Sequence, residues 1–385
     1  MSKNLETSVE AIRSAISEAS KNLIERETLV ELVALAAVAS EHVLIIGAPG
    51  TAKSEAVRRI AKATGGNYFE YLLGRFTEPS EIFGPVDLRK LKEGIVETEI
   101  SGMLPEAEIA FLDEIFLGST AILNTLLGIL NERIFRRGHT RINVPLRVCV
   151  GASNALPMDE SLAAFADRFL VRLFVEPIAD PLLENLLEGG WDLAKKDFSH
   201  AAKVEDIDTL SNLVSSVDLS KIRPSIAQAV RILRSAGINI SDRRAVKMQR
   251  LIASATILDG RMTAEMRDLW TLIYAVPTHE QQSLARDSLH DFLVETENKT
   301  LPFAAEDASL GAMARATRLV NIASETLQNP TENEDAWKLK LEGIAREIDA
   351  GFNAETIPAD LAEIRAKIVE ILGTKEKENE AIAGN

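Results

Sequence analysis

The chain has 385 residues, 46% of them hydrophobic and 26% charged, and its formal net charge at pH 7 is −15. This length predicts roughly two or three domains with a sizeable core, and the negative charge disfavours non-specific binding to nucleic-acid phosphates. No apolar run reaches the roughly eighteen residues that a membrane span needs, and the polar N-terminus and single cysteine, Cys149, predict a cytoplasmic chain without a disulfide.

The hydrophobic pattern changes three times along the chain. Two amphipathic helices are predicted from residue 3 to about residue 40. From His42 to Val175, short apolar runs alternate with helical segments, which predicts a parallel sheet with helices on both faces. Beyond about residue 180 helical periodicity returns, with a helix start at Arg223-Pro224-Ser225. The predicted strands are Val43–Ile46, Tyr68–Leu73, Ile109–Leu112, Arg147–Ala152, in which Cys149 should be buried, and Val171–Val175.

A glycine-rich segment follows the first predicted strand and opens a helix. It reads Gly47-Ala48-Pro49-Gly50-Thr51-Ala52-Lys53-Ser54, with Glu55 next. This order is typical of a phosphate loop, whose backbone N–H groups and helix N-terminus bind phosphates. We expect Lys53 to reach the β- and γ-phosphates and Ser54 to coordinate Mg²⁺. Ala52 stands where a glycine usually precedes the lysine, and its methyl group is tolerable if the backbone there is already helical.

Polar side chains end two further predicted strands. Asp113 and Glu114 follow Ile109–Leu112, and Asn154 ends a later strand. The carboxyl ends of parallel strands share one edge of the sheet, so these groups should lie beside the phosphate loop. Asp113 would hold Mg²⁺ through its water shell, and Glu114 would polarise the attacking water. Asn154 could bond the γ-phosphate or that water, or could simply form the turn before Ala155-Leu156-Pro157.

An arginine lies beyond the last of these strands. Arg168 cannot easily face the nucleotide of its own chain, but it could complete a neighbour's site as an arginine finger. The alternatives are a surface salt bridge between Arg168 and Asp167, or a finger at the nearby Arg172.

In their order along the chain, these motifs resemble the MoxR family of AAA+ ATPases, and most closely its RavA branch, which commonly carries the alanine found at Ala52. The resemblance covers about residues 20 to 275. The segments that carry it are Gly47–Ser54, Phe76–Pro85, Ser101–Ala107, Phe111–Ile115, Ile122–Leu127, Asn131–Arg133, Ala152–Asn154, Asp167–Arg168 and Ser241–Arg244.

The resemblance implies a role for each matching residue. It assigns phosphate and magnesium binding to Lys53 and Ser54. Asp113 would be the magnesium-binding acid and Glu114 the water-activating acid. Asn154 would be the first sensor and Arg168 the arginine finger. Arg243 would be the second sensor, with Arg244 as its competitor.

The expected domains combine this resemblance with the hydrophobic pattern. We expect an AAA+ α/β nucleotide-binding domain over residues 1–180 and an all-α lid over 181–277. A C-terminal helical region should follow over 278–373, ending in a frayed, charged tail over 374–385. The RavA branch carries a small β-containing insertion in its C-terminal helices, but Pro302–Ile371 shows no strand-like alternation. The C-terminal helices could therefore be a generic scaffold or a docking face.

Two predicted β-hairpins are candidate pore or substrate elements, although they could also be ordinary edge hairpins. Leu88–Gly102 alternates around a turn at Gly94, and Arg133–Arg147, turning at Gly138-His139, resembles the family's hairpin before the first sensor. His139 should be a solvated turn residue, so we expect no metal other than Mg²⁺.

The sequence therefore predicts a Mg²⁺-dependent ATPase that forms a hexamer and remodels a protein client. By resemblance, its natural partner contains a von Willebrand A domain, and its role is chaperone-like. The main rival is a nucleic-acid motor or loader, favoured by five arginines in and beside the second hairpin: Arg133, Arg136, Arg137, Arg141 and Arg147. A non-catalytic scaffold and a P-loop kinase fit the motif set less well.

Overall fold

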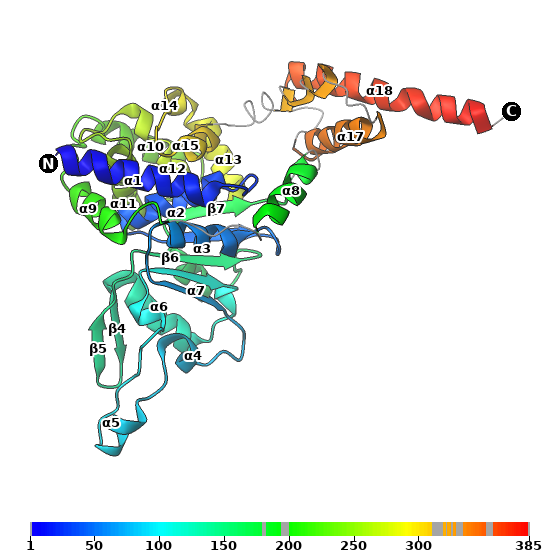
Figure 1. The fold of residues 1–385 in the computed structure, drawn as a ribbon. Helices are drawn as coiled ribbons and strands as arrows, with labels where there is room; N and C mark the ends of the chain where they lie inside the picture. The colour runs from blue at the N-terminus through cyan, green and yellow to red at the C-terminus, as the bar shows by residue number, and fades with distance from the viewer. Residues whose placement is uncertain are drawn as a thin grey trace. The chain divides into compact units, whose positions relative to one another are not determined.

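The computed structural model describes residues 2–178, 182–193, 200–309, 319–320, 322–324, 326–328, 334–351 and 357–383 (Figure 1). The chain forms two compact units. The first contains Met1–Pro177 and Lys195–Ser309, and the second contains Ile178–Ala194 and Leu310–Asn385.

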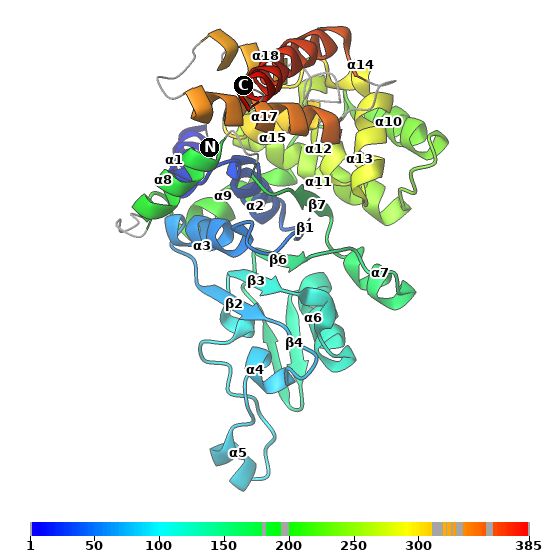
Figure 2. The same cartoon turned by 90° about the vertical axis from the view of Figure 1, so that its right-hand side faces the viewer.

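The centre of the first unit is a five-stranded sheet with the order β2-β3-β6-β1-β7 (Figure 2). All neighbouring strands are parallel. Strands β1 and β6 are almost entirely buried, as expected for a sheet covered on both faces. The five predicted strands are confirmed as β1 Val43–Gly47, β2 Tyr68–Leu72, β3 Ile109–Asp113, β6 Val148–Ser153 and β7 Val171–Val175.

Helices cover both faces of this sheet. Helices α2 (Glu27–Ala39) and α3 (Lys53–Ala63) lie on one face, and α1 (Ser2–Ser20) packs over both of them. Helix α2 is buried continuously from Leu29 to Ala39, because it lies between the sheet and other helices. On the other face, strand side chains including the buried Cys149 join a core with α6 (Thr120–Glu132) and α7 (Glu160–Ala166).

The second predicted hairpin is confirmed, whereas the first is wrong at its tip. Strands β4 (Ile134–Arg137) and β5 (Thr140–Asn143) pair antiparallel. The tip of Leu88–Gly102 is instead a short helix, α5 (Leu88–Lys92), although its flanks Val86 and Thr98 still pair. The helix forms because the Asp87 carboxylate caps its first turn, 2.8 Å from the Arg89 N–H, and Gly94 turns left-handed behind it.

These two segments contact each other through their turns. The His139 N–H donates to the Val96 carbonyl at 3.0 Å, and the Thr98 N–H donates to the Thr140 hydroxyl at 2.8 Å. In both views of the ribbon, α5 lies at the end of this region that is farthest from the five-stranded sheet (Figures 1 and 2).

The helices that complete the first unit extend past the expected lid boundary at residue 277. Contacts group residues 278–309 with the sheet rather than with the C-terminal helices.

A short helix α4 (Pro79–Phe83) precedes α5. The later helices are α9 (Val204–Val214), α10 (Arg223–Ser235), α11 (Asp242–Leu258), α12 (Thr271–Tyr274), α13 (His279–Ser288), α14 (His290–Leu293) and α15 (Pro302–Ser309), and short 3-10 turns span Leu104–Glu106, Ile115–Leu117 and Met266–Asp268.

The second unit contains α8 (Leu183–Leu193), α17 (Glu334–Gly351) and α18 (Ala359–Ala383). Its apolar core includes Leu341, Ile348, Leu361 and Ile368. The described part of 302–371 contains no strand, in line with its sequence pattern. The expected frayed tail instead continues α18 to Ala383, since its Glu, Lys and Ala residues are strong helix formers. No described helix has the length and apolar character needed to cross a membrane.

Candidate functional site

The predicted phosphate loop, residues 47–54, connects β1 to α3 at the carboxyl edge of the sheet, where all five strands end. Gly47 lies so close to β7 that a Cβ atom would come within 2.3 Å of the Val175 carbonyl oxygen. Gly50 has a φ of +77°, in the left-handed region that glycine adopts without strain. Gly47 is therefore required because the backbone of β7 lies so close to it, and Gly50 is required because of its backbone conformation.

Ala52 does not have the helical backbone that would make its methyl group harmless. Its φ is 58° and its ψ is 24°, so it is a left-handed N-cap immediately before Lys53. For an L-residue this conformation costs about 1–2 kcal/mol relative to the right-handed helix. The condition under which the methyl group would be tolerable, a helical backbone at Ala52, is therefore not met.

Lys53 points back into the loop. Its amino group donates to the carbonyls of Gly47 at 2.7 Å and Ala48 at 2.9 Å, and only 7% of the residue is exposed. Burial lowers the pKa of Lys53, while the nearby carboxylates of Asp113 and Glu114 act in the opposite direction. The amino group therefore lies inside the loop and close to both acids.

Glu114 and Asn154 meet at this edge. The Asn154 amide donates to the Glu114 carboxylate at 2.7 Å, and the Asp113 carboxylate accepts the Glu114 N–H at 3.0 Å. Glu114 has a φ of 48° and a ψ of 45°, an uncommon conformation for a residue other than glycine. Such conformations persist where the surrounding structure enforces them and often occur at functional sites. The structure thus brings the predicted acids together with the predicted first sensor.

The oxygen donors near the loop suit Mg²⁺, which prefers a few hard oxygen ligands together with water and substrate phosphates. Ser54 supplies a hydroxyl in the first turn of α3, and Asp113 supplies a carboxylate at the end of β3. Among the described residues there is no cluster of three or more His, Cys, Asp or Glu side chains that would form a separate metal cage. Glu55 points along α3 instead, where it pairs with Arg58 and Arg59.

A buried arginine that the motifs did not reveal ties the loop to the sheet. The Arg26 guanidinium donates to the carbonyls of Thr51 at 2.8 Å, Glu176 at 2.9 Å and Glu25 at 2.6 Å. Burial lowers the pKa of Arg26, against the influence of Glu25 and Glu27. Its acceptors are backbone atoms far apart in sequence, so no local pattern could have identified it.

The predicted finger lies at the opposite, amino edge of the sheet. Arg168 follows α7 and precedes β7, and its guanidinium donates to the Ala164 carbonyl at 3.2 Å. Its rival Arg172 is 3% exposed and donates to the Ala166 carbonyl, and burial lowers its pKa to about 9. Arg172 is therefore still charged at neutral pH, but its side chain is enclosed and cannot project towards another subunit.

Both second-sensor candidates also lie at the amino edge. Arg243 donates to the Asn131 side chain at 2.7 Å, at the end of α6, and the neighbouring Leu130 carbonyl contacts His42 immediately before β1. Arg244 donates to the Leu170 carbonyl, immediately before β7, at 2.9 Å. A five-residue strand is about 16 Å long. Within one chain, the structure therefore does not bring Arg168, Arg243 or Arg244 to the phosphate loop.

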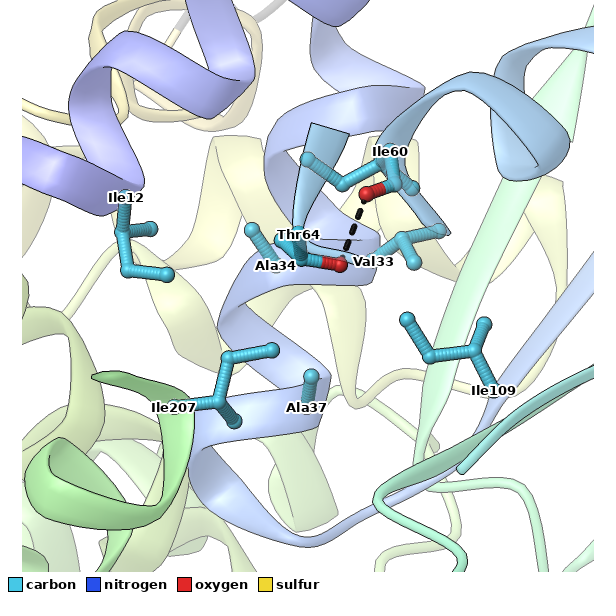
Figure 3. Close-up of a pocket in the computed structure, with 8 residues that line it drawn as sticks. All are labelled: Ile12, Val33, Ala34, Ala37, Ile60, Thr64, Ile109 and Ile207. Carbon is cyan, nitrogen blue, oxygen red and sulfur yellow. Dashed lines mark hydrogen bonds between the residues drawn. The ribbon is translucent and has the colours of Figure 1, made fainter. Parts of the chain in front are cut away.

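A small apolar cavity between α1, α2, α3, α9 and β3 is separate from this site (Figure 3). Its volume of about 10 Å³ has room for one water molecule at most. The Thr64 hydroxyl at its wall is already bonded to the Ile60 carbonyl at 2.8 Å. The cavity is a packing defect and not a ligand site.

Comparison with known proteins identifies two regions of the chain. A family model described as the MoxR domain of MoxR-vWA-beta-propeller ternary systems matches residues 10–213, which is more than half of the chain. A model of an AAA lid domain matches residues 217–285.

Two curated relatives and one solved structure are similar to the chain. An uncharacterized protein of Methanocaldococcus jannaschii is 39% identical over 257 residues, which are 66% of this chain and 67% of that protein. The chaperone MoxR1 of Mycobacterium tuberculosis is 27% identical over 180 residues, which are 45% of this chain and 46% of that protein. The chain thus spans about two thirds of the first relative and less than half of the second.

The solved structure comes from Cytophaga hutchinsonii and is described provisionally as an ATPase. It superposes with a TM-score of 0.61 and 16% identity, covering 77% of this chain and 97% of that one. At this identity the likeness concerns the fold alone. Together with the lid match, it confirms the predicted parallel α/β sheet followed by helical regions.

Proposed function

Because the chain belongs to the MoxR family of AAA+ ATPases, we propose that it hydrolyses ATP in a site shared by two subunits and uses the hydrolysis to remodel a protein client. The main support is the position of Glu114, which lies 2.7 Å from Asn154 and close enough to Lys53 to influence its pKa. The residues that we propose as water-activating acid, orienting amide and phosphate-binding lysine thus share one edge of the sheet.

The chain's own residues would divide the work at this edge. The N–H groups of the loop and the amino group of Lys53 would bind the β- and γ-phosphates, replacing the carbonyls that Lys53 now contacts. Ser54 and Asp113 would hold Mg²⁺, which neutralises charge on the phosphates when bound. Glu114 would polarise the attacking water, and Asn154 would keep its carboxylate oriented.

The remaining positive charge would come from a neighbour. Arg168 is separated from its own phosphate loop by the length of the sheet, so in our proposal it reaches the nucleotide of an adjoining subunit. Such a head-to-tail contact repeats, and it closes into a ring when the rotation between neighbours adds up to a full turn; we propose that it does so as a hexamer. The alanine at Ala52 favours the RavA branch, and the matched MoxR-domain model favours a partner with a von Willebrand A domain.

The rival nucleic-acid motor loses support from the contacts of its arginines. Arg133 donates to the Ser40 carbonyl at 2.8 Å, and Arg137 donates to the Gly84 carbonyl at 2.8 Å. Arg136 pairs with Glu132, and Arg147 pairs with Asp208. Four of the five arginines thus have partners within this protein, which leaves fewer of them available for a phosphate backbone.

Three variants test the proposal when ATP binding and turnover are measured together. Lys53→Ala should abolish binding, whereas Glu114→Gln should bind ATP without hydrolysing it. Arg168→Ala should bind ATP almost normally and lose turnover by about 10³-fold, the scale of an arginine finger. Normal turnover of Arg168→Ala as a dilute monomer would contradict the shared site. Salt-sensitive stimulation of turnover by DNA would favour the nucleic-acid motor.

A further inference from the structure

We propose that Arg244 is a positioning residue: it holds the segment that carries Arg168 in place and does not contact a phosphate. This inference rests on the proposed role of Arg168 as the finger. Arg244 lies in the first turn of α11, where the Ser241 hydroxyl caps its N–H at 3.2 Å. Only 3% of the residue is exposed.

The guanidinium of Arg244 is occupied on all three nitrogens. Its Nε and Nη2 atoms donate to the Asp167 carboxylate at 3.2 and 2.9 Å. Its Nη1 atom donates to the Leu170 carbonyl at 2.9 Å and the Ala275 carbonyl at 2.7 Å, and Nη2 also reaches the Phe169 carbonyl at 3.3 Å. A guanidinium has five N–H donors, and these contacts use all of them. Arg244 could bind a phosphate only by giving up buried partners.

The acceptors of Arg244 lie on both sides of Arg168. Asp167 precedes Arg168 and Phe169 follows it, so the contacts bracket the finger in the short link between α7 and β7. The guanidinium of Arg168 itself has a weaker anchor, the Ala164 carbonyl at 3.2 Å. The position of the finger backbone therefore depends on α11, which lies in the region that matches the lid family.

The charges of this cluster favour the same interpretation. Arg172 lies close enough to both groups that Arg244 lowers its pKa while Asp167 raises it. The Asp167 carboxylate thus offsets two buried guanidinium groups that would otherwise repel each other. Arg243, one residue earlier on α11, contacts Asn131 instead and takes no part in this cluster. Of the two second-sensor candidates, Arg244 is therefore the one committed to holding the finger segment.

A double-mutant cycle with Arg168 tests this assignment. Arg244→Lys keeps the charge but loses the forked contacts, and it should lower kcat by about 10- to 100-fold, because a displacement of about 1 Å can cost 10²-fold. The Kd for ATP should stay within about twofold, because no phosphate contact is lost. In an Arg168→Ala background, Arg244→Lys should cause no further loss of kcat, whereas a residue acting directly on phosphate would add its effect.

Two further variants separate positioning from folding. Asp167→Asn should reproduce the kcat loss of Arg244→Lys, and it decides the question if Arg244→Lys does not fold. Arg261→Lys is the matched control, since Arg261 pairs with Asp259 and Asp268 elsewhere in the same helical region. It should lower the unfolding temperature without changing kcat.

Each outcome of these measurements separates the inference from the proposed function. If Arg168→Ala leaves turnover unchanged, the shared-site function fails. If Arg168→Ala lowers turnover, the positioning role of Arg244 is wrong when Arg244→Lys leaves kcat unchanged or weakens ATP binding. It is also wrong if the losses of kcat caused by Arg244→Lys and Arg168→Ala add up in the double variant.

Discussion

Two residues of the candidate site, Ala52 and Glu114, have left-handed backbones although neither is glycine. Ala52 closes the phosphate loop, and Glu114 turns the chain immediately after β3. Backbone strain of this kind is retained where the surrounding structure over-determines it. At Glu114 the strain directs a carboxylate towards Asn154, whereas at Ala52 the methyl group has no evident task.

Ala52→Gly should therefore stabilise the fold. Glycine adopts the left-handed conformation freely, but it is also freer in the unfolded chain. The net gain in the free energy of unfolding should be about 0.5–1 kcal/mol, measured by denaturant titration. Ala121→Gly, at an exposed helical position in α6, is the control and should destabilise by a similar amount. A loss of stability in Ala52→Gly would show that the methyl group makes a needed contact.

Arg26 provides the second test at the residue scale. Arg26→Gln removes a buried cation that holds the carbonyls of Thr51 and Glu176, so the loop should lose part of its preorganisation. A hydrogen bond from a charged group is worth about 1.5–3 kcal/mol, and we expect ATP to bind at least about tenfold more weakly in a calorimetric titration. Arg58→Gln, an ion-paired position on α3, is the control. An unchanged affinity of Arg26→Gln for ATP would show that Arg26 does not contribute to nucleotide binding.

At the scale of elements, a buried carboxylate joins α2 to α15. The Glu31 side chain accepts the N–H groups of Phe303 at 3.4 Å and Ala304 at 2.7 Å. Burial raises the pKa of Glu31 to about 8 from an ordinary value of 4.5, although these N–H groups lower it, and Glu27 raises it further. The protonated form is therefore favoured in the folded state.

This shift makes stability depend on pH in a defined direction. The contribution of Glu31 is fully present below about pH 4.5 and is lost progressively as the pH rises to about 8, because over this range the unfolded chain has released the proton that the folded chain still holds. Thermal unfolding should occur at lower temperature as the pH rises from about 5 to about 8, and Glu31→Gln should flatten this decline. Glu306→Gln, on the exposed side of α15, should not flatten it. An equally steep decline in Glu31→Gln would assign the effect to other groups.

The sequence predicted those elements whose causes are local. The five strands and the phosphate loop were recognisable because alternation, glycines and the residues ending each strand are contiguous. The tip of Leu88–Gly102 was misassigned because five residues can satisfy a strand or a helical pattern equally well. Asp87 before Leu88 is a helix cap, and it was the local indication of the helix.

The contacts that arrange the site could not be predicted in this way. Arg26 reaches the carbonyls of residues 51 and 176, and Arg244 reaches the carbonyls of residues 170 and 275. Every residue has a backbone carbonyl, so nothing in the sequence marks these particular carbonyls as hydrogen-bond partners. The same limitation left Arg244 as an open alternative to Arg243, the preferred second sensor, before their contacts were known.

At the scale of the whole molecule, the phosphate loop and Arg168 lie at opposite edges of one sheet. The strands between these edges form one continuous parallel sheet, so the finger and its own nucleotide are separated by the length of a strand. Two adjoining copies, related head to tail, would complete each site. This separation within one chain is the physical basis of the proposed assembly.

Subunit mixing tests the shared site most directly. Lys53→Ala subunits have a finger but no working phosphate loop, and Arg168→Ala subunits have the reverse, so each should be inactive alone. After random one-to-one co-assembly, half of the loops are intact and half of these face an intact finger. Mixing should then restore up to about a quarter of wild-type turnover. Verified mixed assemblies that show no turnover at any ratio would contradict the account.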